Sequence, residues 1–488
     1  MSGFSRTREV ALRIHQSASF LRTQSTPESI MSLDVKGSVA NIADFIHRAN
    51  VSADARACAA TAFKDTIGVM LAGASEPAAR IAQAMAAEDG IGQCRVLGTS
   101  LHTSPELAAL ANGVAAHSLD YDDMCFVSLA HPSCALVPSI LAVGELVHAR
   151  AAALLDAYVI GFELECRLGN VMNPRHYDKR GWHCTSSIGT VGAAAAAARV
   201  LGLDAHATQH ALGIAASSAC GLKENIGSMV KPLHAGLAAR NGVMAARLAQ
   251  RGFTASPHAI DGPQGYLAVM DSEHDSLDAA VADLGIRWEI LDTGVTVKLY
   301  PSCAATHPPL DALFALKHRE RITADKVQAI DVEVDSMTPR LLIHPDPATG
   351  LEAKFSMPFC AAAAIVYERI GIDSFDSDHI RNPTVQGLMK HVTLRANEEF
   401  DQGAPLARAR VGVYLRDGRV VSQAVDGARG YPGRLTDEEL ATKFAGCATR
   451  TLSDPAANSA WAALSACLAE GGDKINDVRE LTALLSTL

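Results

Sequence analysis

The stretch from Asp120 to Cys134, DYDDMCFVSLAHPSC, concentrates residues that could carry out acid–base chemistry. It places three carboxylates (Asp120, Asp122 and Asp123) within four positions, and His131 follows eight residues after the last of them. Alanine-rich, apolar sequence flanks the stretch on both sides, where unpaired charges are costly to bury. The cluster is either a solvated loop or helix cap, or a set of acids that orients an imidazole and sets its protonation.

Basic or imidazole side chains recur at the predicted starts of four helices. His131 and Lys231 each stand directly before a proline, a residue common at the first helical position. His183 precedes a threonine–serine pair, expected as the N-cap, and then a run of six alanines. The segment KLYPSCAATHPPLDALFALK adds Lys298, and His307 before another proline-started helix. Because helix N-termini favour anions, converging ends with these cations would bind a carboxylate-rich small molecule.

Each of these features, taken alone, has a simpler interpretation. A histidine before a helix is most often a surface cap or a hydrogen-bonded buried residue, and a lone lysine is most often solvated. Ser228 and Lys231 match the S-x-x-K pattern of a serine nucleophile, but the following proline favours a helix start instead. Gly189–Gly192 lacks the preceding strand and the remaining glycine of a dinucleotide site. No H-x-x-x-H or H-E-x-x-H spacing supports a metal, and we expect neither metal nor cofactor.

Hydrophobic periodicity predicts a mainly helical chain up to about residue 283. Apolar residues recur at helical spacing in segments such as 55–73, 105–119 and 206–222, and glycine often closes the segment. Helical sequence returns over 435–452. Abundant alanine with only 5% aromatic residues favours closely packed helices over a β-sandwich.

Valine-rich alternation predicts strands in an α/β second domain from about residue 295. The predicted strands are 295–300 and 327–335, and a hairpin over 409–425 turns at its RDG sequence. We therefore divide the chain into an N-terminal extension (1–33), a helical domain (34–293), a smaller α/β domain (294–430) and C-terminal helices (431–488).

Composition excludes several classes of protein. A chain of 488 residues suggests two or more domains, and 43 basic against 53 acidic residues argue against a nucleic-acid binder. Eleven scattered cysteines without a C-x-x-C pair give little support to zinc or haem and fit a reducing compartment. No apolar stretch approaches the roughly 20 residues that cross a bilayer, so we expect no membrane partner.

The first thirty residues differ from the rest of the chain. They contain four arginines, several serines and few acids, and so resemble a transit peptide. They are otherwise a disordered tail, or Met31 rather than Met1 is the true start. We expect a cytoplasmic protein, or a mitochondrial one if this segment is a transit peptide.

From about Leu33 onward the sequence resembles the MmgE/PrpD family. The motifs that carry the resemblance, in this order, are FKDTIGVMLAG, ANGVAAHSLDYDD, LAHPSCALVPSILAVGE, GWHCTSSIGTVGAAAAAARVLGL, VKPLHAGLAARNGVMAARLA, KLYPSCAATHPPLDA and GYPGRLTDEEL. The family includes 2-methylcitrate dehydratases, cis-aconitate decarboxylases and iminodisuccinate epimerases. The resemblance implies a helical domain completed by the C-terminal helices, an α/β lid, and a homodimer. It also implies cofactor-free chemistry on di- or tricarboxylates in the cleft between domains.

By similarity to cis-aconitate decarboxylases, five residues fall on active-site positions. They are Asp120, His131, His183, Lys231 and Lys298. All but Asp120 are residues that the helix-start pattern also selects.

At three further positions the chain departs from the animal decarboxylases. It has Met124 for a threonine, Cys303 for a histidine and Phe359 for a tyrosine of the lid. The fungal decarboxylase is more similar in GWHC, ACGL, AARNG and KLY, and it also has a cysteine at the Cys303 position. The 2-methylcitrate dehydratases are more distant in these segments.

These observations favour a carboxy-lyase that converts cis-aconitate or a close relative to itaconate. Lysines and helix N–H groups would neutralise carboxylates, while His131, oriented by Asp120 or Asp122, transfers the proton with His183 as partner. The departing carboxylate is expected beside apolar side chains, and the expected substrate-binding residues are Asp122, Met124, Cys303, His307 and Phe359. A hydro-lyase or epimerase of the same family, or a non-catalytic carboxylate-binding protein, remains the alternative.

Overall fold

The computed structural model describes residues 37–488, apart from 272, 402–407, 470–476 and 487–488. The predictions for the N-terminal thirty residues, including the choice between Met1 and Met31, lie outside the described residues. Within the described part of the chain, no helix is long and apolar enough to cross a membrane.

Alanine-rich helices form the centre of the helical domain. Small residues let their axes approach closely: a Cβ added to Gly113 would lie 2.8 Å from the Cα of Gly236, on the neighbouring helix. Because these helices pack so closely, the residues at their N-terminal ends come within reach of one another. The central helices are α4 (Pro105–His117), α5 (Ser133–Val147), α6 (Ala151–Met172), α8 (Cys184–Val200) and α10 (Val230–Gln250).

Further elements complete the helical domain. They are α1 (Ser38–Arg48), α2 (Ala53–Gly73), α3 (Pro77–Glu88), β1 (Cys94–Arg95), β2 (His102–Thr103), α7 (Arg175–Asp178), α9 (Ala205–Ser218), η1 (Lys223–Asn225), α11 (Tyr266–Met270), α12 (Leu277–Ala280) and α13 (Glu289–Asp292). The helices predicted over 55–73, 105–119 and 206–222 correspond to α2, α4 and α9.

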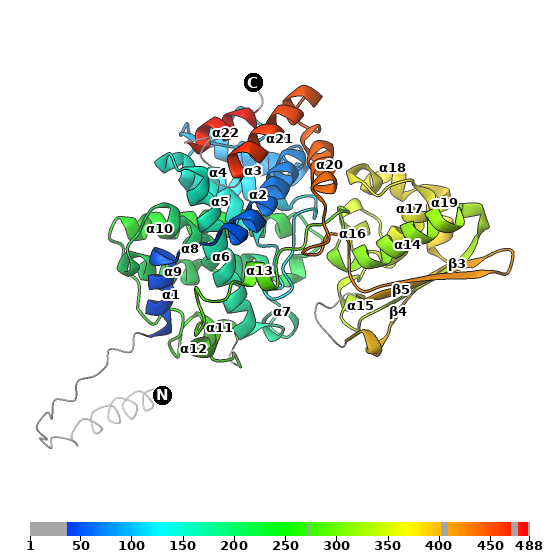
Figure 1. The fold of residues 1–488 in the computed structure, drawn as a ribbon, viewed down its shortest axis with the longest axis horizontal. Coiled ribbons are helices and arrows are strands. Elements are labelled where there is room, and N and C mark those ends of the chain that lie inside the picture. The colour runs from blue at the N-terminus through cyan, green and yellow to red at the C-terminus, as the bar shows by residue number, and fades with distance from the viewer. Residues whose placement is uncertain (1–36, 272, 402–407, 470–476, 487–488) are drawn as a thin grey trace, which may run out of the picture. The chain divides into compact units, whose positions relative to one another are not determined.

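The second domain, called the lid below, is a four-stranded mixed sheet covered by helices. Its strands, in spatial order, are β4 (Val392–Ala396), β3 (Val327–Val334), β5 (Ala409–Leu415) and β6 (Val420–Val425). Strand β3 is parallel to β4 and antiparallel to β5. Val332 pairs with both Leu394 and Val411. Burial alternates along β3 and β5, and Figure 1 shows α14 and α17 on the same side of the sheet. One face of the sheet therefore forms the core of the lid with these helices.

The lid elements follow one another along the chain. They are η2 (Ala304–Thr306), α14 (His307–Glu320), η3 (Ala324–Lys326), β3 (Val327–Val334), α15 (Thr338–Leu341), α16 (Gly350–Ala353), α17 (Met357–Val366), η4 (Ile372–Phe375), α18 (Ser377–Ile380), α19 (Pro383–Met389), β4 (Val392–Ala396), η5 (Glu398–Asp401), β5 (Ala409–Leu415) and β6 (Val420–Val425).

The last helices return to the helical domain. They are α20 (Asp437–Ala448), α21 (Asp454–Leu468) and α22 (Val478–Leu484). Phe444 of α20 lies in the same apolar core as Phe63 of α2, and Gly68 leaves room for its ring. The predicted fold class, a large helical domain with a smaller α/β domain, is confirmed.

Two details of the predicted elements are wrong. Residues 295–300 form no strand: Thr296 pairs only with Met124 in an isolated bridge, and Val297 bonds to the Gly430 carbonyl. Because Met124 and Gly430 both lie in loops, the segment has no neighbouring strand, in the described part of the chain, with which to form a β-ladder. The threonine–serine pair after His183 does not cap α8, because His183 itself is the N-cap residue and both hydroxyl residues lie within the first turn.

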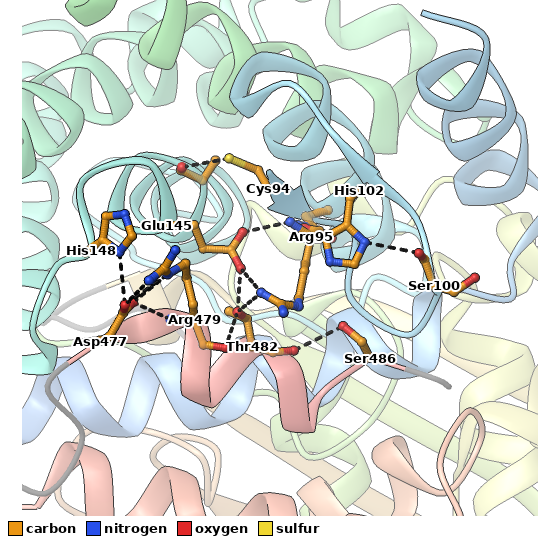
Figure 2. Close-up of polar contacts among 12 residues, drawn as sticks. Cys94, Arg95, Ser100, His102, Glu145, His148, Asp477, Arg479, Thr482 and Ser486 are labelled. Carbon is orange, nitrogen blue, oxygen red and sulfur yellow. Dashed lines mark hydrogen bonds and ion pairs between the residues drawn. The ribbon is translucent and has the colours of Figure 1, made fainter. Parts of the chain in front are cut away.

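A buried carboxylate ties α22 to the helical domain. Glu145 of α5 accepts hydrogen bonds from the Arg95 backbone N–H at 2.7 Å, from its guanidinium at 3.2 Å and from the Thr482 hydroxyl. Figure 2 shows this carboxylate between β1 and α22, with a second ion pair between His148 and Asp477 nearby. Glu145 is 2% exposed, so water cannot replace these bonds.

Replacing Glu145 with glutamine should lower the free energy of unfolding by about 1–3 kcal/mol. Glutamine keeps the shape, but it loses the charge and puts an amide donor against other donors. Urea unfolding followed by circular dichroism measures the change. The matched control is Glu368→Gln, whose side chain is 90% exposed and which should be near neutral. Equal stability of the two variants would contradict this role for Glu145.

Candidate active site

Three of the four predicted helix starts converge on one cavity of about 890 Å³. His131 lies two residues before α5, His183 is the N-cap of α8, and Lys231 is in the first turn of α10. Lys298 reaches the same cavity from the segment between α13 and α14. Because α5, α8 and α10 pack against one another, side chains as far as 100 residues apart in sequence line one site.

Asp120 is the centre of the charged cluster. Its Oδ1 contacts the Lys231 ammonium, lies 3.2 Å from Lys298 Nζ and 4.0 Å from His131 Nε2. Burial alone would raise the pKa of this carboxyl, but the two ammonium groups hold the pKa well below its ordinary value. The same contacts raise the pKa of Lys231 against its own desolvation. The carboxylate is therefore ionised and holds both lysines at the cavity wall.

Buried lysines also hold three consecutive backbone carbonyls in the loop over residues 119–121. Lys354 donates to the first of them, Lys298 to the second at 3.0 Å, and Lys443 to the third at 2.8 Å. Lys354 comes from the lid, and Lys443 comes from α20, where it also pairs with Asp65 at 2.6 Å. These bonds stabilise the end of α4 and the left-handed backbone of the middle residue, whose φ is 51°. They fix the direction of the Asp120 carboxylate.

Asp122 contacts two histidines instead of the lysines. Its Oδ2 lies 2.7 Å from His117 Nδ1 and 3.4 Å from His131 Nδ1. Burial opposes its ionisation, yet the imidazoles lower its pKa. Burial and nearby Lys298 in turn hold the pKa of His131 well below its ordinary value. His131 is thus neutral, with a carboxylate placed to stabilise its imidazolium.

The third acid of the stretch has another role. Asp123 is fully buried away from the cavity and accepts a hydrogen bond from the Ser133 hydroxyl, which also contacts Tyr158 at 2.6 Å. Burial raises the pKa of Asp123 well above its ordinary value. The crowded acids therefore divide into one that pairs with lysines, one that pairs with histidines and one whose burial in the core favours its protonated form.

His183 forms a pair with His234 of α10. Their Nδ1 atoms lie 3.1 Å apart, so one ring donates and the other accepts, and the two cannot both be imidazolium. Burial holds the pKa of His183 well below its ordinary value and lowers that of His234 to about 4. The sequence prediction missed His234, although it stands one helical turn after Lys231, and it missed His117, three residues before Asp120.

The expected substrate-binding residues separate into two groups. Met124 and Cys303 line the cavity. Asp122 lies behind His131 and has no exposed surface, and His307 is buried and bonds to the Ser302 carbonyl at 3.3 Å. Phe359 lies in the core of the lid, with its ring 5.5 Å from that of Phe375, and is not in the cavity wall.

One part of this cluster has the composition of a metal site. Donor atoms of His117, Asp120, Asp122 and His131 lie within 4.8 Å of one another. Lys231 and Lys298 already balance the charge of Asp120 at Oδ1, so a cation there would compete with two ammonium groups for the same oxygen. The arrangement suits an anionic ligand that contacts the lysines and histidines together.

Binding of a dicarboxylate such as succinate should take up protons near pH 7. A dianion beside His131 and His183 raises their depressed pKa values, so affinity should increase as the pH falls from 8 to 6. Calorimetric titration in two buffers of different ionisation enthalpy counts these protons. His183→Asn should reduce the uptake, whereas His148→Asn, at a half-exposed position outside the cavity, should not. Proton release on binding would contradict the arrangement.

Comparisons with known proteins agree with this architecture. The MmgE/PrpD N-terminal domain matches residues 40–277, and the MmgE/PrpD C-terminal domain matches residues 300–469. The chain is 27% identical over 445 residues to the cis-aconitate decarboxylase-like protein oryM of Aspergillus oryzae, covering 86% of this chain and 91% of that protein.

Two further relatives are named cis-aconitate decarboxylase. That of Aspergillus terreus is 26% identical over 418 residues, covering 81% of this chain and 84% of its own. That of Mus musculus is 30% identical over 359 residues, covering 71% of this chain and 72% of its own. Both family domains and these relatives show that the chain belongs to the MmgE/PrpD family.

Proposed function

We propose that the protein is a carboxy-lyase that converts cis-aconitate, or a close relative, to itaconate and carbon dioxide. The observation that carries the proposal is the buried end of the cavity, where Lys231, Lys298 and His131 surround one ionised aspartate and His183 lines the same cavity. This end offers cations for substrate carboxylates beside two neutral imidazoles, and a bound polyanion would raise their pKa values so that they take up protons from solvent. The names of the relatives support the same reaction class.

The reaction needs one broken bond and one transferred proton. The bond between the substrate methylene carbon and its carboxylate breaks, and its electron pair forms the new methylene double bond. The original double-bond pair moves to the carbon beside the remaining terminal carboxylate, giving an enolate-like anion. The imidazolium of His131 protonates that carbon, and His183 is the partner of His131 in this proton transfer. Lys231 and Lys298 stabilise the negative charge that develops on the carboxylate.

The placement of the departing carboxylate follows from the lining of the cavity. Carbon dioxide is uncharged, so the carboxylate that leaves is best placed away from the lysines, against an apolar side chain. Met124 lines the cavity and suits this position. No external electron carrier is needed, because the breaking bond supplies the electrons. We also propose that the protein is a homodimer, as the family resemblance implies.

Proton NMR of the purified protein with cis-aconitate in heavy water tests the proposal. Itaconate with deuterium at the protonated carbon is the expected product, since the proton comes from an exchangeable imidazole. 2-Methylcitrate and iminodisuccinate are measured in parallel. Unchanged cis-aconitate, with dehydration or isotope exchange in either other acid, would replace the decarboxylase with a hydro-lyase or epimerase. The same histidines could then abstract a proton next to a carboxylate.

A further inference from the structure

The cavity is much larger than the substrate proposed above. At the roughly 30 Å³ of a liquid water for each of its about twelve non-hydrogen atoms, a six-carbon tricarboxylate fills at most about 360 Å³. The cavity has about 890 Å³, a volume that suits a ligand of considerably greater size. More than half of the space therefore lies beyond the reach of cis-aconitate.

The part of the cavity away from the lysines is apolar and faces solvent. Leu222 and Ile343 are each 57% exposed, whereas Lys231 is 6% exposed and Lys298 is fully buried, so the cations lie at the deep end. The apolar side chains come from three segments: the loop after the acidic stretch, the segment around η1 and the lid segment around α15. They are Leu129, Leu222, Ile226, Met337, Leu341 and Ile343.

The segment around η1 and the lid segment adjoin each other at the cavity. A Cβ added to Gly227 would lie 3.6 Å from Nε2 of His344, and the Arg340 guanidinium lies 3.9 Å from the Asp178 carboxylate. The apolar residues of these segments therefore line one part of the same cavity, instead of being scattered over open surface. Such an arrangement binds an apolar group by removing both surfaces from water.

The charges in this outer part do not favour further carboxylates or phosphates. Its ionisable side chains are four acids and two bases, and the bases Lys223 and Arg340 share the carboxylate of Asp178 at 3.7 and 3.9 Å. Of the acids, Asp335 accepts hydrogen bonds from the backbone N–H groups of Met337 and Thr338. An anionic extension of the substrate would meet excess negative charge here, while an uncharged chain would not.

We infer that the natural substrate carries an alkyl substituent several carbons long, which occupies the outer, apolar part of the cavity while its carboxylates contact Lys231 and Lys298. The inference rests on the proposed function only for the placement of the substrate carboxylates at Lys231 and Lys298. The chemical class is an alkyl-substituted di- or tricarboxylate, rather than an unsubstituted acid or a nucleotide conjugate.

Binding of non-reacting alkylsuccinates, from methyl to hexyl, by calorimetry with the full-length protein tests the inference. Kd should fall by up to about four-fold for each added methylene, the effect of burying that group. The gain per methylene should disappear in Ile226→Asp and Ile343→Asp. It should persist in the control Ile91→Asp, whose side chain is 99% exposed and outside the cavity. A Kd that stays constant or rises with chain length would overturn the inference.

Turnover separates this inference from the proposed function. If cis-aconitate is decarboxylated but alkylsuccinates bind no more tightly than succinate, the inferred alkyl substituent is wrong and the proposed reaction is supported. If alkylsuccinates with longer alkyl groups bind more tightly, but neither cis-aconitate nor an alkyl-substituted cis-aconitate reacts, the apolar binding site is supported and the proposed decarboxylation is wrong. If both stand, kcat/KM should be higher for the alkyl-substituted acid than for cis-aconitate.

Discussion

Replacing His131 with glutamine should reduce kcat for cis-aconitate by about 10²- to 10⁴-fold, the usual contribution of a positioned general acid or base. The imidazole has Asp122 3.4 Å from Nδ1, and Asp120 4.0 Å from Nε2 on the side of the cavity. This arrangement lets the ring gain a proton when an anion binds and donate it to the substrate. Glutamine keeps most of the volume and can form hydrogen bonds, but it cannot carry the proton.

The measurement is the rate of itaconate formation, with KM determined for each variant. KM should change much less than kcat, because Lys231 and Lys298 remain to bind the carboxylates. The control His148→Gln removes a half-exposed histidine that pairs with Asp477 at the end of α5 and should keep normal turnover. A His131→Gln variant with wild-type kcat would assign proton transfer to another group, with His183 the next to be tested.

The sequence predicts which residues gather at the charged end of the cavity because its signals are local. A proline or a small polar residue beside a histidine or lysine marks a helix start, and three such starts do meet at the cavity. His307 shows the limit of this reasoning. It has the same local pattern, but α14 packs within the lid, and its first residue is buried against Ser302.

The residues that hold the acidic loop could not be predicted in this way. Lys354 lies 235 positions from Leu119, and Lys443 lies 322 positions from Tyr121. No periodicity or spacing relates residues so far apart, and a lysine in a polar segment is usually solvated. Only the packing of the lid and of α20 on the helical domain places these ammonium groups against the loop.

Strand β4 was missed for a different reason. Val392–Ala396 does alternate apolar and polar residues, but it is an edge strand of only 5 residues, none of them fully buried, and so short a pattern is weak evidence for a strand. The opposite error occurs at residues 295–300, which alternate like a strand. There Lys298 lines the cavity and the neighbouring Val297 packs in the core, but the segment has no partner strand among the described residues.

The activity should fall on the alkaline side with an apparent pKa near 8, set by Lys354. Desolvation lowers the pKa of this lysine to about 8, and the charge of Asp120 only partly opposes that effect. Its ammonium contacts the carbonyls of Leu119 and Pro301 and the ring of Phe375, and no carboxylate among the described residues forms an ion pair with it. Loss of its proton removes positive charge beside the loop that fixes Asp120, and kcat/KM should decrease about ten-fold per pH unit above 8.

Lys354→Arg separates this titration from a general structural role. Arginine stays protonated throughout the accessible range, so the alkaline limb of kcat/KM should shift above pH 10 even if the maximal rate is reduced. Lys354→Met should lose most of the activity at every pH, because it removes the donor to both carbonyls. A limb that stays near pH 8 in Lys354→Arg would show that another group titrates there.

Stability gives a readout of Lys354 that does not depend on the reaction. The pKa is about 8 in the folded protein and 10.5 ordinarily, so between these values the unfolded chain binds more protons. This lysine therefore makes the free energy of unfolding rise with pH, by about 3 kcal/mol between pH 8 and 10.5. Denaturant unfolding of wild type and Lys354→Met across this window should show that rise only in the wild type. Parallel curves would mean that the buried ammonium does not titrate there, and that the alkaline limb must have another origin.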